Sequence, residues 1–300
     1  MKLDQYYTKS AVADQCLRKL SKDLPQVKDK IFIEPSAGNG SFYSLLPRRR
    51  RAGLDIAPNG KGIERGDFLK WYPPTSDRER YVVVGNPPFG HRSKLAVSFF
   101  NHAADIADII GFIVPRQFQK YSIHSRLNGD FKLIRDYELG ENSFYTPNGK
   151  DFLVRCVFQE WTRKETGHKN IRLLASPPIS HPDFSMYQYN NTPQALKVFD
   201  ENWDFAVPRQ GFEDYSRRET EKRRCERNKQ WILFKARTHK TLKRLWNFDF
   251  VSLSKKNTII YGFGKADVVM EYKKKYALIC PRWTQLIGAS RHISERRLIR

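Results

Sequence analysis

Apolar residues along the first half of the chain follow two rhythms. Within residues 10–21 they recur every three or four positions, which is typical of an amphipathic helix. Further along they come in short unbroken runs, which are typical of buried strands. We expect strands near residues 30–33, 52–56, 62–64, 81–84, 109–114, 131–139 and 152–161, and a second long helix at 93–106.

Strands that alternate with helices predict a parallel sheet with helices on both faces, so the first half of the chain is assigned to the α/β class. Residues 35–40 form a turn after the first strand and open a short helix, which Pro47 must end because proline cannot continue a helix. No clear helix separates the strands at 131–139 and 152–161.

The pattern changes in the second half of the chain. Residues 163–184 are rich in charge, proline and serine, and this composition predicts a connection. Beyond it the alternation of strands and helices is lost, and aromatic residues are interleaved with basic runs. We therefore expect one domain over residues 1–165 and a smaller α+β domain over residues 185–300.

The net charge narrows the choice of partner. The 300 residues include 54 Lys and Arg against 32 Asp and Glu, which gives +22. This charge exceeds what solubility requires and favours a polyanionic partner, most simply a nucleic acid. The alternative is a basic protein that is merely soluble. The run Arg48-Arg49-Arg50-Arg51 is expected to be a solvated edge, because it lies on a connection away from the predicted substrate edge.

The cysteine spacing argues against a metal site, and the hydropathy argues against a secreted or membrane-spanning protein. The four cysteines, Cys16, Cys156, Cys225 and Cys280, form no C-x-x-C pair, so we predict buried free thiols and no metal site. The N-terminus lacks the apolar core of a signal peptide, and no stretch reaches the roughly 18 apolar residues of a membrane span. We expect an intracellular, cytoplasmic protein (nuclear in a eukaryote) with no membrane partner.

Two of the expected strands lead into segments that carry candidate functional residues. The strand at 30–33 leads into EPSAGNG at residues 34–40, and the strand at 81–84 leads into NPPF at residues 86–89. In this order they resemble the two signature sites of class I S-adenosylmethionine (SAM)-dependent methyltransferases that modify amino nitrogens, above all N6 of adenine. The resemblance covers about residues 5–161, in the gamma-type motif order of adenine-N6 DNA methyltransferases. It implies a Rossmann-like class I methyltransferase sheet closed by an antiparallel hairpin.

This resemblance implies a pocket for SAM at the glycine-rich turn. Glycine lacks a Cβ, so the backbone can approach a ligand closely. The alternative is an ordinary turn between a strand and a helix. The turn residues assigned to the cofactor are Glu34, Pro35, Ala37, Gly38 and Gly40.

Two acids and an aromatic residue complete the predicted cofactor pocket. Asp55 ends the second strand, where a carboxylate can accept hydrogen bonds from both ribose hydroxyls. By resemblance, Asp67 after the third strand reads the amino group of the cofactor adenine, and Phe68 beside it can stack on that ring. A solvated acid and a common Gly-Asp turn are the alternatives for the two carboxylates.

The N-terminal segment resembles the F-Y-T-P sequence that covers SAM in adenine methyltransferases. Here Tyr7 and Thr8 match that pattern, whereas Lys9 stands in place of the proline. The resemblance implies that Thr8 reaches the cofactor carboxylate and that Tyr7 packs over it. The alternative is a helix entry with surface aromatics.

The NPPF segment carries the predicted catalysis. An amino group on an aromatic ring is a poor nucleophile because its lone pair is delocalised. The Asn86 side-chain oxygen and the Pro87 carbonyl can accept both N–H bonds and return electron density to the nitrogen, and Pro87 and Pro88 pre-aim the carbonyl because their φ is fixed. Phe89 offers a face on which an extruded base can stack. Phe144 and Tyr145, in a later loop, are predicted to line the same base pocket, with core packing as the alternative.

The leading hypothesis is therefore a SAM-dependent methyltransferase acting on N6 of adenine in DNA, with the base flipped into the pocket. The same chemistry on RNA is the first alternative, because the loop contacts the base and not the sugar. A protein glutamine methyltransferase and a non-catalytic subunit that binds SAM or nucleic acid are further alternatives. A partner subunit is also left open.

Overall fold

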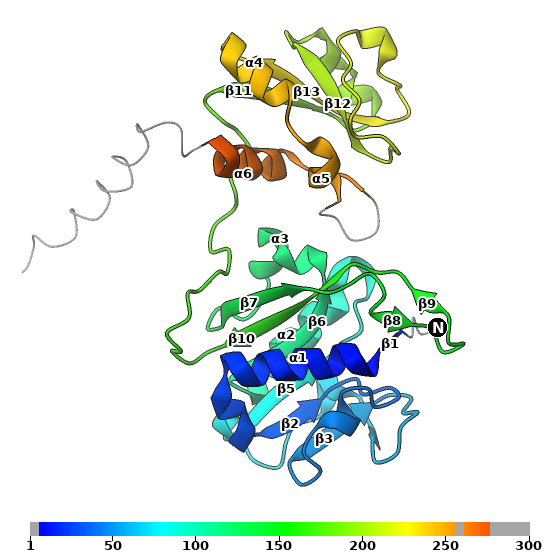
Figure 1. Cartoon of the computed structure of the whole chain (residues 1–300), viewed down its shortest axis with the longest axis vertical. Helices are drawn as coiled ribbons and strands as arrows, with labels where there is room; N and C mark the ends of the chain where they lie inside the picture. Colours follow the sequence, from blue (N-terminus) through cyan, green and yellow to red (C-terminus); the bar gives the residue numbers. More distant parts are fainter. Residues whose placement is uncertain (1–5, 256–260, 277–300) are drawn as a thin grey trace, which may run out of the picture. The chain divides into compact units, whose positions relative to one another are not determined.

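The computed structural model describes residues 6–255 and 261–276 of the chain (Figure 1). Two compact units divide between Ser176 and Pro177. No helix in the described ranges is long and apolar enough to span a bilayer. The three cysteines within them are buried free thiols, as predicted, whereas Cys280 lies outside the described residues.

The first unit is built on a seven-stranded sheet. Its strands are β2 (Ile31–Glu34), β3 (Arg51–Asp55), β4 (Glu64–Arg65), β5 (Tyr81–Gly85), β6 (Ile109–Pro115), β7 (Lys132–Glu138) and β10 (Cys156–Thr162). They lie in the order β4-β3-β2-β5-β6-β10-β7, and β10 is antiparallel to both of its neighbours. This is the antiparallel closing hairpin that the methyltransferase resemblance implies.

A smaller sheet and several helices complete the first unit. The small sheet has the order β1 (Tyr7–Thr8), β8 (Phe144–Tyr145) and β9 (Asp151–Phe152). The α-helices are α1 (Ser10–Asp23), α2 (Lys94–Ile106) and α3 (Tyr121–His124). The 3-10 turns are η1 (Pro25–Asp29), η2 (Tyr43–Leu45), η3 (Phe68–Lys70), η4 (Arg78–Arg80), η5 (His91–Ser93) and η6 (Arg116–Gln119).

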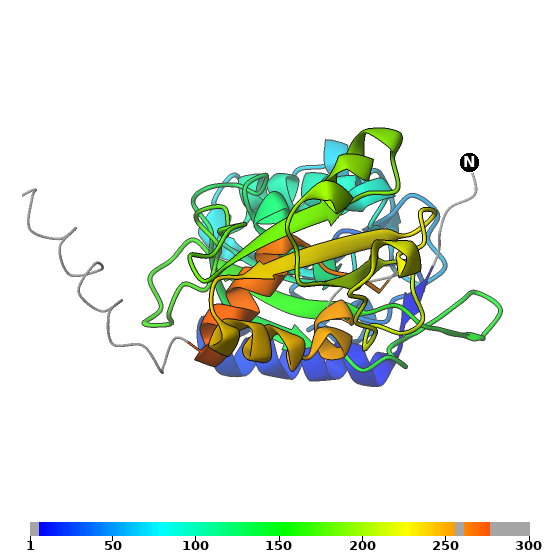
Figure 2. The ribbon, with the colours of Figure 1, turned by 90° about the horizontal axis from the view of Figure 1, so that it is seen from above.

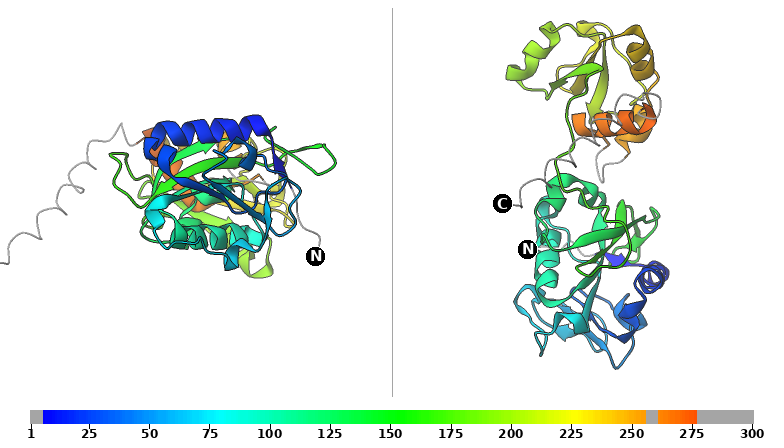
Figure 3. Two further views of the ribbon diagram at one scale, coloured as in Figure 1. Left: turned by 90° about the horizontal axis from the view of Figure 1, so that it is seen from below. Right: turned by 90° about the vertical axis from the view of Figure 1, so that its left-hand side faces the viewer.

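The apolar runs become central strands because both faces of the sheet are covered. Successive side chains on a strand point to opposite faces, so residues in register across neighbouring strands share a face. The face packed against α1 includes Phe32, Val82 and Ile109. The face packed against α2 includes Ile33, Val83 and Ile110. Figure 3 (right) shows α1 and α2 on opposite sides of the sheet, which confirms the predicted Rossmann-like α/β fold.

Two local predictions differ from the structure. The helix expected after the turn at 35–40 is only the single 3-10 turn η2, because Pro47 follows so closely. The strand expected at 152–161 is split, since β9 pairs with β8 whereas β10 pairs with β6 and β7.

The second unit is a three-stranded antiparallel sheet with helices. Its elements are β11 (Phe184–Tyr189), η7 (Pro193–Asp200), β12 (Phe205–Gln210), η8 (Lys222–Arg224), β13 (Gln230–Ala236), α4 (His239–Trp246), α5 (Phe250–Ser254) and α6 (Lys265–Tyr276). The strand order is β11-β13-β12, and Figure 2 shows α4 and α5 beside these strands. Many of the aromatic residues noted in the sequence form its core, including Phe205, Trp231 and Phe234, each fully buried.

A buried acid lies between α1 and the closing hairpin of the first unit. Glu160 on β10 is fully buried, and burial raises the pKa of its carboxyl to about 8, with the nearby Asp23 carboxyl adding to the effect. Asp23 at the end of α1 is itself held by the Tyr137 hydroxyl, which donates to it, and by the Arg135 guanidinium at 3.4 Å. The folded chain therefore holds a proton on Glu160 more tightly than the unfolded chain does.

We expect the stability of the protein to fall as pH rises from 4.5, the ordinary pKa of a glutamate, to about 8. Below that window both states are protonated and the stabilisation is complete; it is lost as pH rises through the folded-state pKa. Glu160→Gln should flatten this dependence, measured as the free energy of unfolding in urea across the window. Glu213→Gln, at an exposed position, is the control. An unchanged slope in Glu160→Gln would contradict the assignment.

Candidate cofactor and acceptor site

The two signature segments meet at one edge of the main sheet. Strands β2 and β5 are parallel neighbours, with Ile33 opposite Val83, so the loops that follow them leave from the same edge. The Ser36 hydroxyl in the glycine-rich turn donates a hydrogen bond to the Asn86 carbonyl at 3.0 Å. The predicted cofactor turn and the predicted catalytic loop are thus in direct contact.

The glycine-rich turn is tied to the end of β3. Gly38 and Gly40 have φ values of +50° and +85°, which glycine adopts readily. The Gly38 N–H donates to Asp55 Oδ2 at 2.7 Å, and the Ala57 N–H donates to Asp55 Oδ1 at 2.8 Å. The Asp55 carboxylate is thereby fixed beside the turn. A Cβ on Gly38 would lie 3.1 Å from Tyr7 Cε1, so the Tyr7 ring packs directly on the turn.

Glu34 is a buried carboxyl at the point where the two loops diverge. It is 2% exposed, and burial raises the pKa of its carboxyl well above its usual range, although the Phe42 and Tyr43 backbone groups hydrogen-bond to it and oppose the rise. Its Oε2 has no hydrogen-bond partner among the described residues. Gly85 allows this approach: at φ +146°, a Cβ on it would lie 3.2 Å from Glu34 Cγ.

The N-terminal strand reaches the catalytic loop. Strand β1 pairs with β8, with Thr8 opposite Phe144, and Thr8 is 3% exposed. The Asn86 side-chain N–H donates to the Thr8 hydroxyl oxygen at 3.2 Å. With its nitrogen held in this way, the Asn86 Oδ1 is buried and has no partner in the described part of the chain. A buried acceptor without a donor is unusual and is available to a ligand.

The rest of the NPPF loop is held by a tight turn. Pro87 is buried, and Phe89 is half-buried against the core beneath α1. Beyond it, Arg92 and Ser93 have left-handed φ values of +51° and +59°. Non-glycine residues rarely adopt this conformation, and such strain is often found near functional sites.

Three of the predicted site residues take part in local capping or core packing. Asp67 caps η3, and one of its carboxylate oxygens accepts from the Leu69 N–H at 3.1 Å. Phe68 and Phe144 are each 1% exposed inside core clusters, so the stacking roles predicted for them do not fit their positions. Tyr145 remains half-buried at the site.

Ser36 and Asn39 are site residues that sequence reasoning missed, although both lie within the glycine-rich segment. The Asn39 side-chain N–H donates to the Tyr145 hydroxyl at 2.6 Å and thereby joins the turn to β8. Polar side chains at the end of a strand are a sequence signal for a functional site. The hydrogen-bond partners of Ser36 and Asn39, however, are set by the pairing of distant strands. Among the described residues, no group of three His, Cys, Asp or Glu could hold a metal ion.

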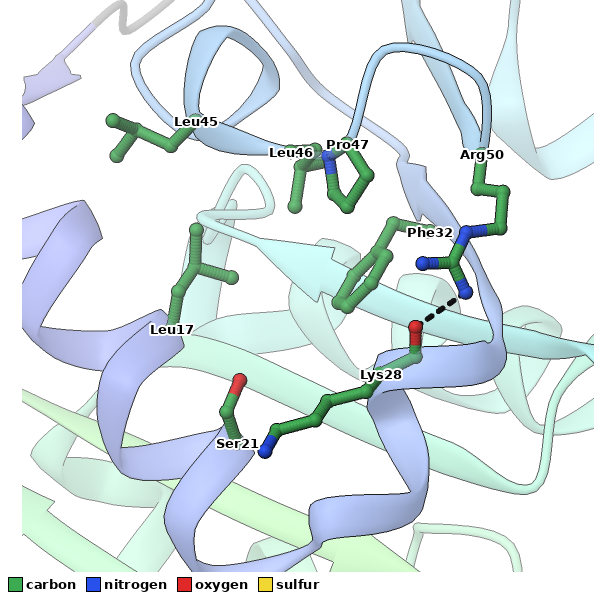
Figure 4. A pocket seen from close by; sticks show the side chains of 8 residues that line it. All are labelled: Leu17, Ser21, Lys28, Phe32, Leu45, Leu46, Pro47 and Arg50. Atoms are coloured by element: carbon green, nitrogen blue, oxygen red, sulfur yellow. Dashed lines mark hydrogen bonds between the residues drawn. The ribbon is translucent and has the colours of Figure 1, made fainter.

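Two hollows lie near these elements. One, of about 300 Å³, opens at the opposite edge of the sheet, where β2 and β3 begin (Figure 4). It is lined by Leu17, Ser21, Lys28, Phe32, Leu45, Leu46, Pro47 and Arg50, none of which is a predicted site residue. The other, of about 250 Å³, borders Asn39 and Gly40 of the turn.

Two residues of the arginine run donate hydrogen bonds to backbone carbonyls, which was not expected from the sequence. Arg51 donates to the Tyr43 carbonyl at 2.7 Å and to the Leu46 carbonyl at 3.1 Å, and Arg50 donates to the Lys28 carbonyl. The Arg51 bonds satisfy carbonyls at the two ends of η2, and the Arg50 bond satisfies a carbonyl of η1. Half of the run therefore bonds to neighbouring backbone instead of forming a solvated edge.

Solved structures share the fold. The type IIL restriction-modification enzyme MmeI, in complex with DNA, matches with a TM-score of 0.51 and 10% identity over 87% of this chain and 67% of that chain. A Pyrococcus horikoshii protein, provisionally described as an RNA methyltransferase, matches with a TM-score of 0.43 and 18% identity over 53% and 85%. A type I restriction-modification methyltransferase subunit from Streptococcus thermophilus matches with a TM-score of 0.41 and 15% identity over 55% and 46%.

The chain matches no family model and no curated protein. At 10% identity, the likeness to MmeI concerns the fold. Its coverage of 87% of the chain is more than the first unit alone can supply, so the match extends into the second unit.

Gly38→Ala should lower the free energy of unfolding by about 1–2 kcal/mol, because an L-residue at this left-handed φ is strained and its Cβ meets the Tyr7 ring. Urea denaturation measures the change. Gly129→Ala is the matched control, since a Cβ there meets nothing within 4 Å. Equal stability of the two variants would show that the turn tolerates a side chain.

Proposed function

We propose that this protein is a SAM-dependent methyltransferase that modifies the N6 amino group of adenine in DNA. The observation that carries the proposal is the Asn86 carboxamide beside the glycine-rich turn, whose Oδ1 is buried and has no partner within residues 6–255 and 261–276. A buried amide oxygen that lacks a donor can accept a hydrogen bond from an N–H group of a ligand.

The residues around the turn fit SAM. Gly38 and Gly40 supply the positive φ values of the turn. Glu34 Oε2, which has no partner among the described residues, can accept from the ammonium group of a bound amino acid. Asp55 is fixed by two backbone N–H groups and can accept from ribose hydroxyls through its remaining lone pairs. Asp67 is assigned to the cofactor adenine. When bound, SAM supplies an electrophilic methyl group on a sulfonium.

The residues of the loop prepare the acceptor nitrogen. The Asn86 Oδ1 and the Pro87 carbonyl accept from the two N–H bonds of the amino group and draw its lone pair out of the ring. Both acceptors are set before the substrate arrives, so little reorganisation opposes the reaction. The nitrogen's extra proton leaves to water after transfer, and alignment accounts for most of the rate.

An adenine within a polymer reaches this loop only if it is extruded from its stack. Phe89 is half-buried and has part of its ring accessible to a base, and Tyr145 lies across the small sheet from Tyr7, with ring centroids 5.7 Å apart. We assign Phe89 to stacking on the extruded base and Tyr145 to the wall of the pocket.

The net charge of +22 supports a nucleic acid as the substrate. DNA is favoured because the MmeI structure, which contains DNA, matches 87% of this chain and therefore extends into the second unit. We assign residues 1–165 to chemistry and residues 185–300 to recognition of the nucleic acid. RNA is the second candidate, because the NPPF loop carries acceptors for the base and no group assigned to the sugar 2′-hydroxyl.

The decisive experiment is transfer of labelled methyl from SAM to double-stranded DNA, single-stranded DNA and RNA of matched sequence, followed by nucleoside analysis. N6-methyladenine in one polymer supports the chemistry and identifies the substrate. Absence of label in all three, with SAM bound, would refute the proposed substrate class.

Asn86→Ala should lower kcat by at least about 100-fold, because it removes one of two preorganised acceptors. SAM affinity, measured by calorimetry, should be unchanged. Asn170→Ala is the matched control: it follows the far end of β10, and its side chain bonds only to a local backbone N–H. Retained activity in Asn86→Ala would show that another group activates the nitrogen.

Thr8→Val should lower kcat about tenfold, the equivalent of one hydrogen bond, because the Asn86 amide loses the contact that orients it. Thr8→Ser keeps the hydroxyl and should restore kcat. A weaker SAM affinity with unchanged kcat at saturating SAM would instead favour the cofactor role that the resemblance implies for Thr8.

A further inference from the structure

Several cations of the second unit are paired with carboxylates. Arg217 pairs with Glu219 and Glu226, at 2.8 Å each, and Lys235 pairs with Asp204 at 2.7 Å. On η8, Lys222 pairs with Asp200, and Arg223 pairs with Glu221. These charges are neutralised locally, so they add little to the attraction of a polyanion.

Helix α4 differs from these segments because its exposed cations have no carboxylate partner among the described residues. The segment from Arg237 to Trp246 contains no acidic residue. Its inward face is formed by Thr241 and Leu245, both buried, and Thr238 caps the helix by accepting from the Thr241 N–H. The outward face presents Lys240 and Lys243, which are exposed and have no ion-pair partner in the described ranges.

The end of α6 extends this basic face. The Arg244 guanidinium lies 4.8 Å from the centre of the Tyr276 ring, so the two helices contact each other at this point. Figures 1 and 3 both show α4 and α6 close together. Lys274 and Lys275, in the last turn of α6, are exposed beside it.

An aromatic residue lies at the end of the same helix. Trp246 is 43% exposed, and its ring rests against Phe205, with centroids 5.3 Å apart. An exposed indole next to exposed cations is the combination found on nucleic-acid-binding platforms, where the cations contact phosphates and the ring contacts bases or sugars.

We propose that this surface binds the phosphodiester backbone of the nucleic acid. Its members, called here the α4 surface, are Arg237, Lys240, Lys243, Trp246, Lys274 and Lys275. The assignment rests on the proposed function and adds to it the face of the second unit that meets the polymer. Its local excess of positive charge, with no acid on α4, complements a phosphate backbone, which DNA and RNA share.

The test is the salt dependence of binding by the full-length protein. The double variant Lys240→Gln/Lys243→Gln should weaken binding and reduce the slope of log K against log salt by about 1.8 on duplex DNA, or about 1.4 on a single strand, since each phosphate contact contributes roughly 0.9 or 0.7. Duplex DNA, single-stranded DNA and RNA of equal length are compared, and the polymer with the largest loss is the one that the surface contacts.

Lys222→Gln/Arg223→Gln is the matched control, because it removes the same charge from cations that have carboxylate partners. It should leave the slope unchanged. An unchanged slope in Lys240→Gln/Lys243→Gln, or an equal reduction in the control, overturns the proposal.

These outcomes differ from a failure of the proposed function. If the wild-type protein transfers no methyl to any polymer, yet the Lys240→Gln/Lys243→Gln slope falls as expected, binding by the α4 surface is supported and the proposed methyl transfer is refuted. If the protein methylates adenine and the Lys240→Gln/Lys243→Gln variant keeps the wild-type slope, the proposed methyl transfer is supported and binding by the α4 surface is refuted. A wild-type protein that binds none of the three polymers overturns both.

Discussion

The parallel pairing of β2 with β5 is the constraint on which the rest of the site depends. It brings the ends of two strands, far apart in the sequence, to the same edge of the sheet. Gly85 lets the contact become close, since any side chain there would press on Glu34. The glycine-rich turn, the NPPF loop and the strand that carries Thr8 then assemble around this junction.

Two buried polar atoms at this junction, like both carboxylate oxygens of Glu160, have no hydrogen-bond partner among the described residues. Leaving a buried acceptor unpaired costs about 1–3 kcal/mol, yet Glu34 Oε2 and Asn86 Oδ1 lie within neighbouring loops without donors among the described residues. Glu160, a buried acid elsewhere in the unit, lies beside the ionic groups of α1 and β7. Two unpaired acceptors in neighbouring loops agree with the proposed ligand site, because a ligand with its own N–H groups can pair with both.

Sequence patterns predicted the main sheet well because its strands are buried on both faces and read as unbroken apolar runs. They predicted less where a role depends on contacts between distant segments. Phe68 and Phe144 stand next to other predicted site residues, but both side chains are buried in core clusters. The bonds from Asn86 to Thr8 and from Ser36 to the Asn86 carbonyl require the pairings of β1 with β8 and of β2 with β5, which no local pattern reveals.

The hydrogen bond from Ser36 to the Asn86 carbonyl has a thermodynamic consequence. One partner belongs to the turn on the cofactor side and the other to the loop on the acceptor side, so a ligand that orders one segment lowers the entropy cost of ordering the other. If the two segments bind cofactor and acceptor as proposed, coupling through this bond is reciprocal, and each ligand strengthens the binding of the other by the same factor. Under the same proposal, release of either product weakens the binding of the product that remains.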